Sequence, residues 1–308
     1  MTDATAANPP MTPSAAAAPR AEDATPPRRK SWWRRLLRDK AAAIALSFLA
    51  IVCLAAIFAP LVAPYDPYET SRKMMLPPVW SDRGTWEHLL GTDGQGRDIL
   101  SRVIYGSRLT LAIGLISVGI AGTIGSFLGL LGAFIPKLDA LIMRTADVML
   151  SFPAILLGLA LVAMMGQGAV PIILALSISA VPDCARIARG IGMGIMKEEY
   201  IEAGRALGLR QSQLFTRYLL RNAVPSILIF ISLRFGQMIL LGASLSFLGL
   251  GVRPPMAELG TMAAQGRDFF LFSPHIAVIP SMLILMIVLA VNVAGDALRD
   301  VLDPRLQS

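Results

Sequence analysis

Long stretches without a charged side chain divide this chain and limit the folds that it can adopt. Residues 41–65 and 109–136 contain no Asp, Glu, Lys or Arg, and residues 148–182 form a longer uncharged run. Roughly 20 apolar residues in a helix cross the ~30 Å hydrocarbon core of a membrane. With 55% hydrophobic and 16% charged residues, the composition predicts an all-α, polytopic membrane protein.

Six transmembrane helices are predicted from the positions of the charges. The run at 148–182 is too short for two full spans plus a turn, so we expect two helices joined by a tight outer turn at Gly166-Gln167-Gly168. Arg144 with Asp147, and Asp183 with the arginines after it, are expected at their cytoplasmic ends. The other four helices are expected at about 41–65, 109–136, 223–250 and 273–295.

The distribution of Lys and Arg predicts the orientation of these helices. With both termini in the cytoplasm, 19 of these residues lie inside and eight lie outside, as the positive-inside rule requires. The net charge of +7 therefore reflects basic residues beside apolar spans, and nucleic acid is not an expected partner. We expect a multi-pass membrane protein, and the family resemblance described below implies a bacterial inner membrane.

The N-terminal 40 residues differ in composition from the rest of the chain. Residues 1–27 are rich in Ala, Pro and Thr and are predicted to be disordered. The basic segment at 28–38 contains Trp32 and Trp33, which favours contact with membrane lipid headgroups; a solvated basic tail is the alternative. Residues 1–40 are therefore expected to form a basic cytoplasmic tail.

A polar, helix-forming segment at 197–222 separates two apolar runs, and the predicted orientation places it in the cytoplasm. Gly208 suits the left-handed end of a helix, and Ser212 is predicted to cap the next helix. Ala203 and Gly204 predict a low surface that a partner's groove approaches closely. An ordinary amphipathic loop is the alternative interpretation.

The segment at 91–108 predicts a structured outer turn. Its Gly94-Gln95-Gly96 run lacks the Gly-Lys-Ser/Thr of a phosphate loop. Thr92 or Asp93 is expected to cap a helix in which Asp98 and Arg102 form an i,i+4 pair. The predicted orientation places this turn on the outer side of the membrane.

Arg234 interrupts the fifth predicted span. Because a charge facing lipid is costly, we expect Arg234 to face the bundle, water or another subunit, with a partner from outside its own helix. A structural ion pair and a charge that lines a pathway both remain open. Glycines repeated through the second predicted span are expected to serve helix packing.

Four segments, in order, resemble the permeases of dipeptide, oligopeptide and nickel ABC importers. Residues 91–108 resemble the family pattern GTDxxGRDxxSRxxYGxR, residues 246–255 resemble SFLGLGxxPP, and residues 295–305 resemble GDxLRDxLDPR. The polar segment resembles the EAA loop, with Glu202-Ala203 and Gly208 at the family spacing. The departures from the family patterns are Gly204, Tyr218, Arg221 and Leu259.

This resemblance implies an ABC transmembrane type-1 fold of the second permease type. It implies a first helix at 41–65, an extracytoplasmic segment at 66–105, a core at 106–300 and a cytoplasmic C-terminus at 301–308. A coupling loop at about 195–222 would contact an ATPase through Tyr200, Glu202, Ala203, Gly204, Arg205 and Gly208. The outer-loop motif comprises Gly91, Thr92, Asp93, Gly96, Arg97 and Asp98.

The resemblance also implies a non-enzymatic subunit without a cofactor, a metal or catalytic residues. Its implied partners are a second homologous permease, two cytoplasmic ATP-binding subunits and an extracytoplasmic substrate-binding protein. Dipeptides or oligopeptides are the expected substrates, with nickel or glutathione as alternatives. A self-sufficient secondary transporter would require acidic residues inside spans, whereas Asp147, Asp183 and Asp296 are expected at cytoplasmic ends. A membrane scaffold is a third hypothesis.

Overall fold

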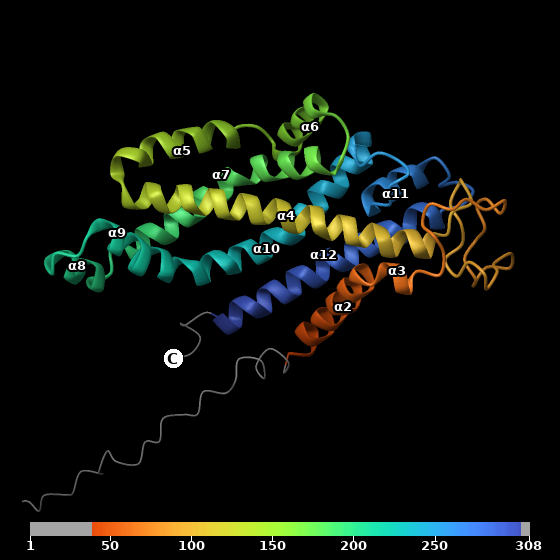
Figure 1. The fold of residues 1–308 in the computed structure, drawn as a ribbon, viewed down its shortest axis with the longest axis horizontal. Coiled ribbons are helices and arrows are strands. Elements are labelled where there is room, and N and C mark those ends of the chain that lie inside the picture. Colours follow the sequence, from red (N-terminus) through yellow and green to blue (C-terminus); the bar gives the residue numbers. More distant parts are fainter. Residues whose placement is uncertain (1–38, 303–308) are drawn as a thin grey trace, which may run out of the picture.

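The computed structural model describes residues 39–302, and the predicted features at 1–38 and 303–308 lie outside the described residues. Within this range the only β-type pairing is an isolated bridge between Thr92 and Asp98; helices form the rest of the regular structure (Figure 1). In chain order these are α2 Lys40–Ile57, α3 Ala59–Val62, α4 Ile99–Phe134, α5 Pro136–Leu150, α6 Ala154–Met165, α7 Ala169–Ile195, α8 Glu199–Ala206, α9 Gln211–Gln213, η1 Leu214–Leu220, α10 Arg221–Leu245, η2 Ser246–Leu250, α11 Leu259–Arg267 and α12 His275–Leu302.

Five stretches of helix are long and apolar enough to cross a membrane, namely α2, α4, α7, the continuous Gln211–Leu250 helix and α12. The pair α5 and α6 gives a sixth span if it crosses as one unit, but it is bent by 86°. The bend coincides with Pro153, which lacks an N–H group and restricts the residue before it. The α6 helix alone has 12 residues, or about 18 Å.

The bend corrects the expectation of a simple helix after residue 148. The expected tight turn is confirmed, because α6 ends at Met165 and α7 begins at Ala169. Gly166 has a φ of +90° and Gly168 a φ of +154°, conformations that glycine adopts without strain. The second span also differs from its prediction, since α4 begins at Ile99, ten residues before the expected start.

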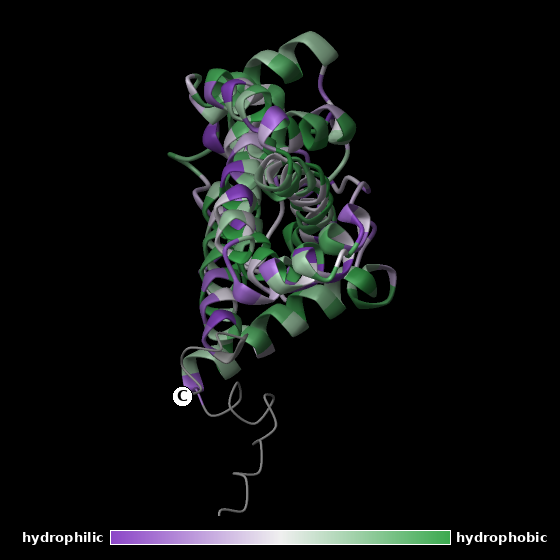
Figure 2. Cartoon of the chain, turned by 90° about the vertical axis from the view of Figure 1, so that its left-hand side faces the viewer, coloured by the Kyte–Doolittle hydropathy of each residue, from purple (hydrophilic) through white to green (hydrophobic). Residues whose placement is uncertain are grey.

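Most glycines on α4 allow close packing against neighbouring helices, which confirms their predicted role, but a Cβ at Gly119 would meet nothing within 4 Å. A Cβ at Gly129 would lie 2.1 Å from the carbonyl oxygen of Ala185 on α7. A Cβ at Gly122 would lie 2.5 Å from Ile231 on α10. Figure 2 shows hydrophobic residues along most of the helices, and many large apolar side chains of α2, α4 and α12 are exposed, as expected for helices in contact with lipid. The bundle therefore combines a close-packed centre with an apolar exterior.

The α8 helix and the segment at 66–98 lie at opposite ends of the bundle (Figure 1). Between them, the helix Gln211–Leu250 spans 40 residues with a kink at Gly249 near its end, or about 60 Å at 1.5 Å per residue. The fold therefore separates the polar α8 region from the outer-loop motif by the length of the bundle. These two ends hold the candidate functional residues.

Candidate coupling and outer-face sites

The α8 helix ends at a glycine, as the sequence predicts. The Leu209 N–H donates to the Gly204 carbonyl at 3.1 Å, and the Gly208 N–H donates to the Arg205 carbonyl at 3.0 Å. Gly208 has a φ of +74°. This pair of hydrogen bonds with a left-handed residue is a Schellman motif. The chain therefore reverses sharply after α8 and returns toward the bundle.

One face of α8 is packed and the other is exposed. Ile201 is fully buried. A Cβ on Gly204 would lie 3.1 Å from methyl groups of both Leu209 and Leu214. Gly204 therefore faces inward, which corrects the expectation that it contributes to a low outer surface. The residues of α8 and its C-cap that face solvent are Glu199, Tyr200, Glu202, Ala203, Arg205, Ala206 and Leu207.

The turn after α8 leads directly into the long helix. Arg210, not Ser212, is the N-cap of α9, and its N–H donates to the Gln213 side chain at 3.1 Å. The expected cap at Ser212 is therefore wrong, because Ser212 lies inside α9. Tyr200 on α8 stacks on Tyr218 of η1 with ring centroids 6.3 Å apart. Burial, and secondarily the nearby Glu198 carboxylate, raise the pKa of Tyr200 above its usual range.

Arg234 on α10 finds its partner on α7. Its Nη2 lies 2.8 Å from Oδ2 of Asp183, and its Nη1 donates to Gln237 Oε1 at 2.7 Å. The guanidinium also lies over the Phe230 ring, 5.2 Å from its centroid. The prediction of a partner from outside the helix is confirmed. Asp183 lies 12 residues before the end of α7, which corrects its expected place at a cytoplasmic helix end.

Two further ion pairs join α5 to α7. Arg189 forms a bidentate contact with Asp139, in which Nη2 lies 2.6 Å from Oδ2. Arg186 lies 2.5 Å from Asp147, and both of these side chains are more than half exposed. Together with the Asp183–Arg234 pair, these contacts connect α7 to α5 and to α10 through ion pairs.

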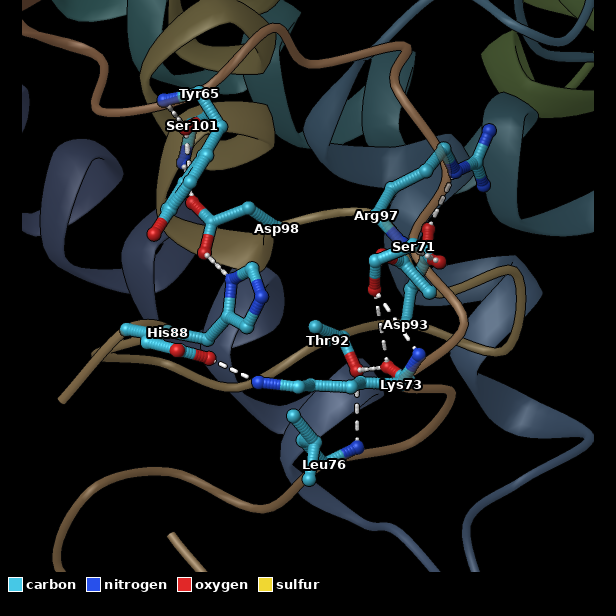
Figure 3. Close-up of polar contacts among 12 residues, drawn as sticks. Tyr65, Ser71, Lys73, Leu76, His88, Thr92, Asp93, Arg97, Asp98 and Ser101 are labelled. Carbon is cyan, nitrogen blue, oxygen red and sulfur yellow. Dashed lines mark hydrogen bonds and ion pairs between the residues drawn. The ribbon is translucent and has the colours of Figure 1, made fainter. Parts of the chain in front are cut away.

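Asp98 is the N-cap of α4 at the outer end (Figure 3). Its Oδ2 accepts from the backbone N–H and the hydroxyl of Ser101, both at 2.8 Å. Its Oδ1 lies 2.9 Å from Nδ1 of His88. Asp98 thus replaces the expected caps Thr92 and Asp93. It also does not form the expected pair with Arg102, because its oxygens are engaged by Ser101 and His88.

Asp93 organises the turn before α4. Its Oδ1 accepts from the backbone N–H groups of Gln95 and Arg97 at 2.8 and 3.0 Å. Its Oδ2 accepts from Nε of Arg97 at 2.7 Å and lies 3.4 Å from Nε of Arg102. Since a carboxylate already occupies these amides, the turn does not present them to a phosphate. The structured outer turn is confirmed, although its caps differ from those expected.

The rest of the outer motif holds the segment at 66–98 against this turn. The Thr92 hydroxyl donates to the Lys73 carbonyl at 2.6 Å and accepts from the Leu76 N–H at 2.9 Å (Figure 3). A Cβ at Gly91 would lie 2.1 Å from the Leu76 carbonyl oxygen, and one at Gly96 an equal distance from the Ser71 carbonyl oxygen. These contacts explain why glycine and threonine occupy these positions.

Glu258 is a structural carboxylate that the sequence analysis did not identify. It is 2% exposed, and it accepts from the N–H groups of Gly260 and Thr261 at 2.9 and 2.7 Å, which caps α11. Thr110 on α4 also donates to it at 3.0 Å. An acidic residue directly before a short helix is an N-cap signal that was available in the sequence.

Comparison with known proteins identifies the family. Residues 121–308 match the family described as binding-protein-dependent transport system inner membrane component. Residues 28–78 match the N-terminal TM domain of oligopeptide transport permease C. The chain belongs to this family of ABC importer permeases, and it is a multi-pass transmembrane permease subunit.

Individual relatives cover nearly the whole chain. The di/tripeptide transport system permease protein DppC of Pseudomonas aeruginosa is 42% identical over 272 residues, covering 88% of this chain and 90% of the relative. The glutathione transport system permease protein GsiD of Pectobacterium atrosepticum is 40% identical over 276 residues, covering 89% of this chain and 90% of the relative.

A solved structure supports the fold. An inward-facing form of the MetNI methionine ABC transporter matches with a TM-score of 0.55 and 20% identity, covering 66% of this chain and 97% of that chain. This likeness concerns the fold alone, and it confirms the predicted ABC transmembrane type-1 architecture.

Proposed function

We propose that this permease forms half of the pathway of an ATP-driven importer of dipeptides or oligopeptides. Its proposed partners are a second, homologous permease, two cytoplasmic ATP-binding subunits and an extracytoplasmic substrate-binding protein. ATP hydrolysis takes place in the separate subunits. The chain lies in a bacterial inner membrane with both termini in the cytoplasm, which the 19 Lys and Arg residues assigned to that side support.

The observation that carries this proposal is the attachment of α8 to the long helix. Ile201 is buried, Gly204 lies against Leu214 in the first turns of the helix Gln211–Leu250, and Tyr200 stacks on Tyr218. The opposite face of α8 is exposed, and Leu207 at its end is 82% exposed. A helix that is fixed on one side and open on the other is suited to enter a groove of a soluble subunit.

Transport then follows from a shift between two arrangements of the bundle. Closure of the ATP-binding subunits displaces α8, and α10 moves with it because α8 packs against η1, which continues directly into α10. The Asp183–Arg234 pair ties α10 to α7, so the displacement reaches a second helix. The nucleotide-bound state favours an outward-facing pathway, and hydrolysis reverses this preference. In this mechanism the contact residues are Tyr200, Glu202, Ala203, Arg205 and Gly208, while Gly204 fixes α8 from within.

Peptides are proposed as substrates because relatives at about 40% identity carry the names of a di/tripeptide and a glutathione system. Import of glutathione or nickel by the same machinery is the alternative. The outer turn formed by Gly91, Thr92, Asp93, Gly96, Arg97 and Asp98 is proposed to shape the surface on which the binding protein docks. Its rigidity, which comes from the Asp93 and Asp98 hydrogen bonds, supports this role.

Co-purification tests the proposed function. The wild-type chain, expressed with its neighbouring transport genes, is expected to retain a stoichiometric ATPase, and Glu202→Arg or Gly208→Trp is expected to lose it. Gly194→Trp is the matched control, because Gly194 lies in open space on α7 rather than on α8. Retention of the ATPase by the α8 variants would contradict the coupling role. Uptake into liposomes by the purified chain alone would instead support a self-sufficient transporter.

A further inference from the structure

A small cavity at the end of the bundle opposite α8 is lined by arginines, and the residues around it provide too few acceptors for the arginine N–H groups. It has a volume of about 200 Å³ and lies between the turn before α4, the end of α11 and the start of α12. Its lining includes Asp93, Gln95, Arg97, Arg102, Gln265, Asp268 and Phe269. The family resemblance implies no ligand for this cavity.

Arg102 is the central observation. Its side chain is 1% exposed, and its Nη1 donates to the carbonyls of Pro67 at 3.1 Å and Pro255 at 3.4 Å. Its Nη2 is buried and has no hydrogen-bond partner within residues 39–302. An unpaired donor on a buried guanidinium is costly. Because Arg102 lines the cavity, its positive charge would stabilise an anion bound there.

Arg97 adds donors to the same cavity. Its Nε is bonded to Asp93, whereas its two Nη atoms make no hydrogen bond to another described residue, and Figure 3 shows them extending beyond the Asp93 carboxylate. The Asp93 carboxylate does not accept hydrogen bonds from these Nη atoms, because its oxygens already accept from two backbone amides and from the Nε of Arg97. The Asp268 carboxylate lies beside its own arginine, Arg267, and is largely exposed. Two buried arginines thus share one buried carboxylate.

This balance selects the chemistry of the ligand. The excess of one positive charge matches a monoanion, and planar guanidinium groups pair well with a carboxylate. A phosphate dianion would exceed the excess charge and would approach the carboxylates of Asp93 and Asp268. A cavity of about 200 Å³ is also smaller than the roughly 300–1,000 Å³ of small-molecule sites, but it accommodates the end of an acidic side chain.

We propose that this cavity receives an Asp or Glu side chain of the extracytoplasmic binding protein when that protein docks. The proposal rests on the proposed function, which supplies the partner. The loop that follows the cavity exposes Phe270, Leu271 and Phe272 by 53%, 88% and 84%. Aromatic residues, including Phe, and arginine are enriched in protein interfaces, which favours a protein over a free ion.

Gln265→Glu tests the proposal with little change in shape. Gln265 lines the cavity and is partly exposed, so the substitution adds a negative charge without removing a contact of Arg97 or Arg102. In the complete transporter in nanodiscs, we expect the dissociation constant of the binding protein to rise at least tenfold. Ser81→Glu, which adds the same charge at an exposed position of the outer segment, is expected to change it less than threefold. Gln265→Lys is expected to preserve or tighten docking.

A second series identifies the carboxylate. Asp→Asn and Glu→Gln variants of the binding protein are tested against both transporters, and one of them is expected to dock equally to wild type and to Gln265→Glu. Equal docking of the wild-type binding protein to both transporters would overturn the proposal, and it would leave water as the occupant. If Gln265→Glu instead raises the KM only for peptides with a free C-terminal carboxylate, and not for amidated ones, the ligand is the substrate and the assignment to the partner is wrong. Absence of docking to the wild-type transporter would refute the proposed function itself.

Discussion

At the scale of single residues, buried carboxylates determine how the outer half of this permease is built. Asp93, Asp98 and Glu258 each accept hydrogen bonds from backbone N–H groups at the start of a turn or helix. Glu258 also accepts from Thr110, and thereby joins α11 to α4. Because charged acceptors form strong hydrogen bonds with amides, these residues fix segments that are distant in sequence.

Replacement of Glu258 by glutamine is expected to destabilise this region. One of its oxygens becomes an NH₂ group, which cannot accept from the amides and hydroxyls that now face it. The loss is expected to be about 1–3 kcal/mol, seen as a lower thermal unfolding midpoint in detergent. Glu69→Gln changes an exposed carboxylate and serves as the control. Equal midpoints for the two variants would show that the carboxylate at 258 is dispensable.

At the scale of elements, the uncharged runs predicted which segments are helical but not where each helix begins. Arg108, the last charged residue before the run, placed the expected start of the second span at 109, yet α4 begins at Ile99 and includes Arg102. The arginine is accommodated by Asp93 and by carbonyls of Pro67 and Pro255, the latter 153 residues away. Such long-range partners leave no mark in the local pattern. By contrast, Pro153 and Glu258 carried local signals for the bend and for the α11 cap.

The contact between α7 and α10 depends on the Asp183–Arg234 pair. Asp183→Asn leaves Arg234 without its counter-ion inside the apolar part of the molecule, which is unfavourable. We therefore expect lower yield of folded protein and slower ATP-dependent uptake in proteoliposomes. The exchanged pair Asp183→Arg with Arg234→Asp is expected to recover part of both.

The Arg186–Asp147 pair provides the comparison for this experiment, because its side chains are 54% and 62% exposed. Exposed ion pairs contribute roughly 0–1 kcal/mol, so Arg186→Gln is expected to have little effect. If the exchanged pair recovers nothing while each single variant is inactive, Arg234 has a role in the pathway that a simple ion pair does not describe.

At the scale of the whole molecule, the two ends of the bundle differ, and the sequence predicted which segments form them. The polar segment forms α8 at one end, the outer motif forms a rigid turn at the other, and one continuous helix runs from beside α8 to the outer half of the bundle (Figure 1). The sequence could not show which side of α8 is packed. Gly204 matched a surface motif but faces Leu209 and Leu214, because the return of the chain after Gly208 covers it.

The central claim is that α8 is a cytoplasmic helix that an ATP-binding subunit covers. Labelling of Leu207→Cys with a membrane-impermeant maleimide tests it most directly, after Cys53 and Cys184 are replaced by serine. Leu271→Cys, at an exposed position near the opposite end, reports the other side of the membrane. We predict that position 207 reacts only in inside-out vesicles and is protected when the ATPase is bound, while position 271 reacts only in right-side-out vesicles. Reaction of position 207 from the outside, or no protection by the ATPase, would contradict the account.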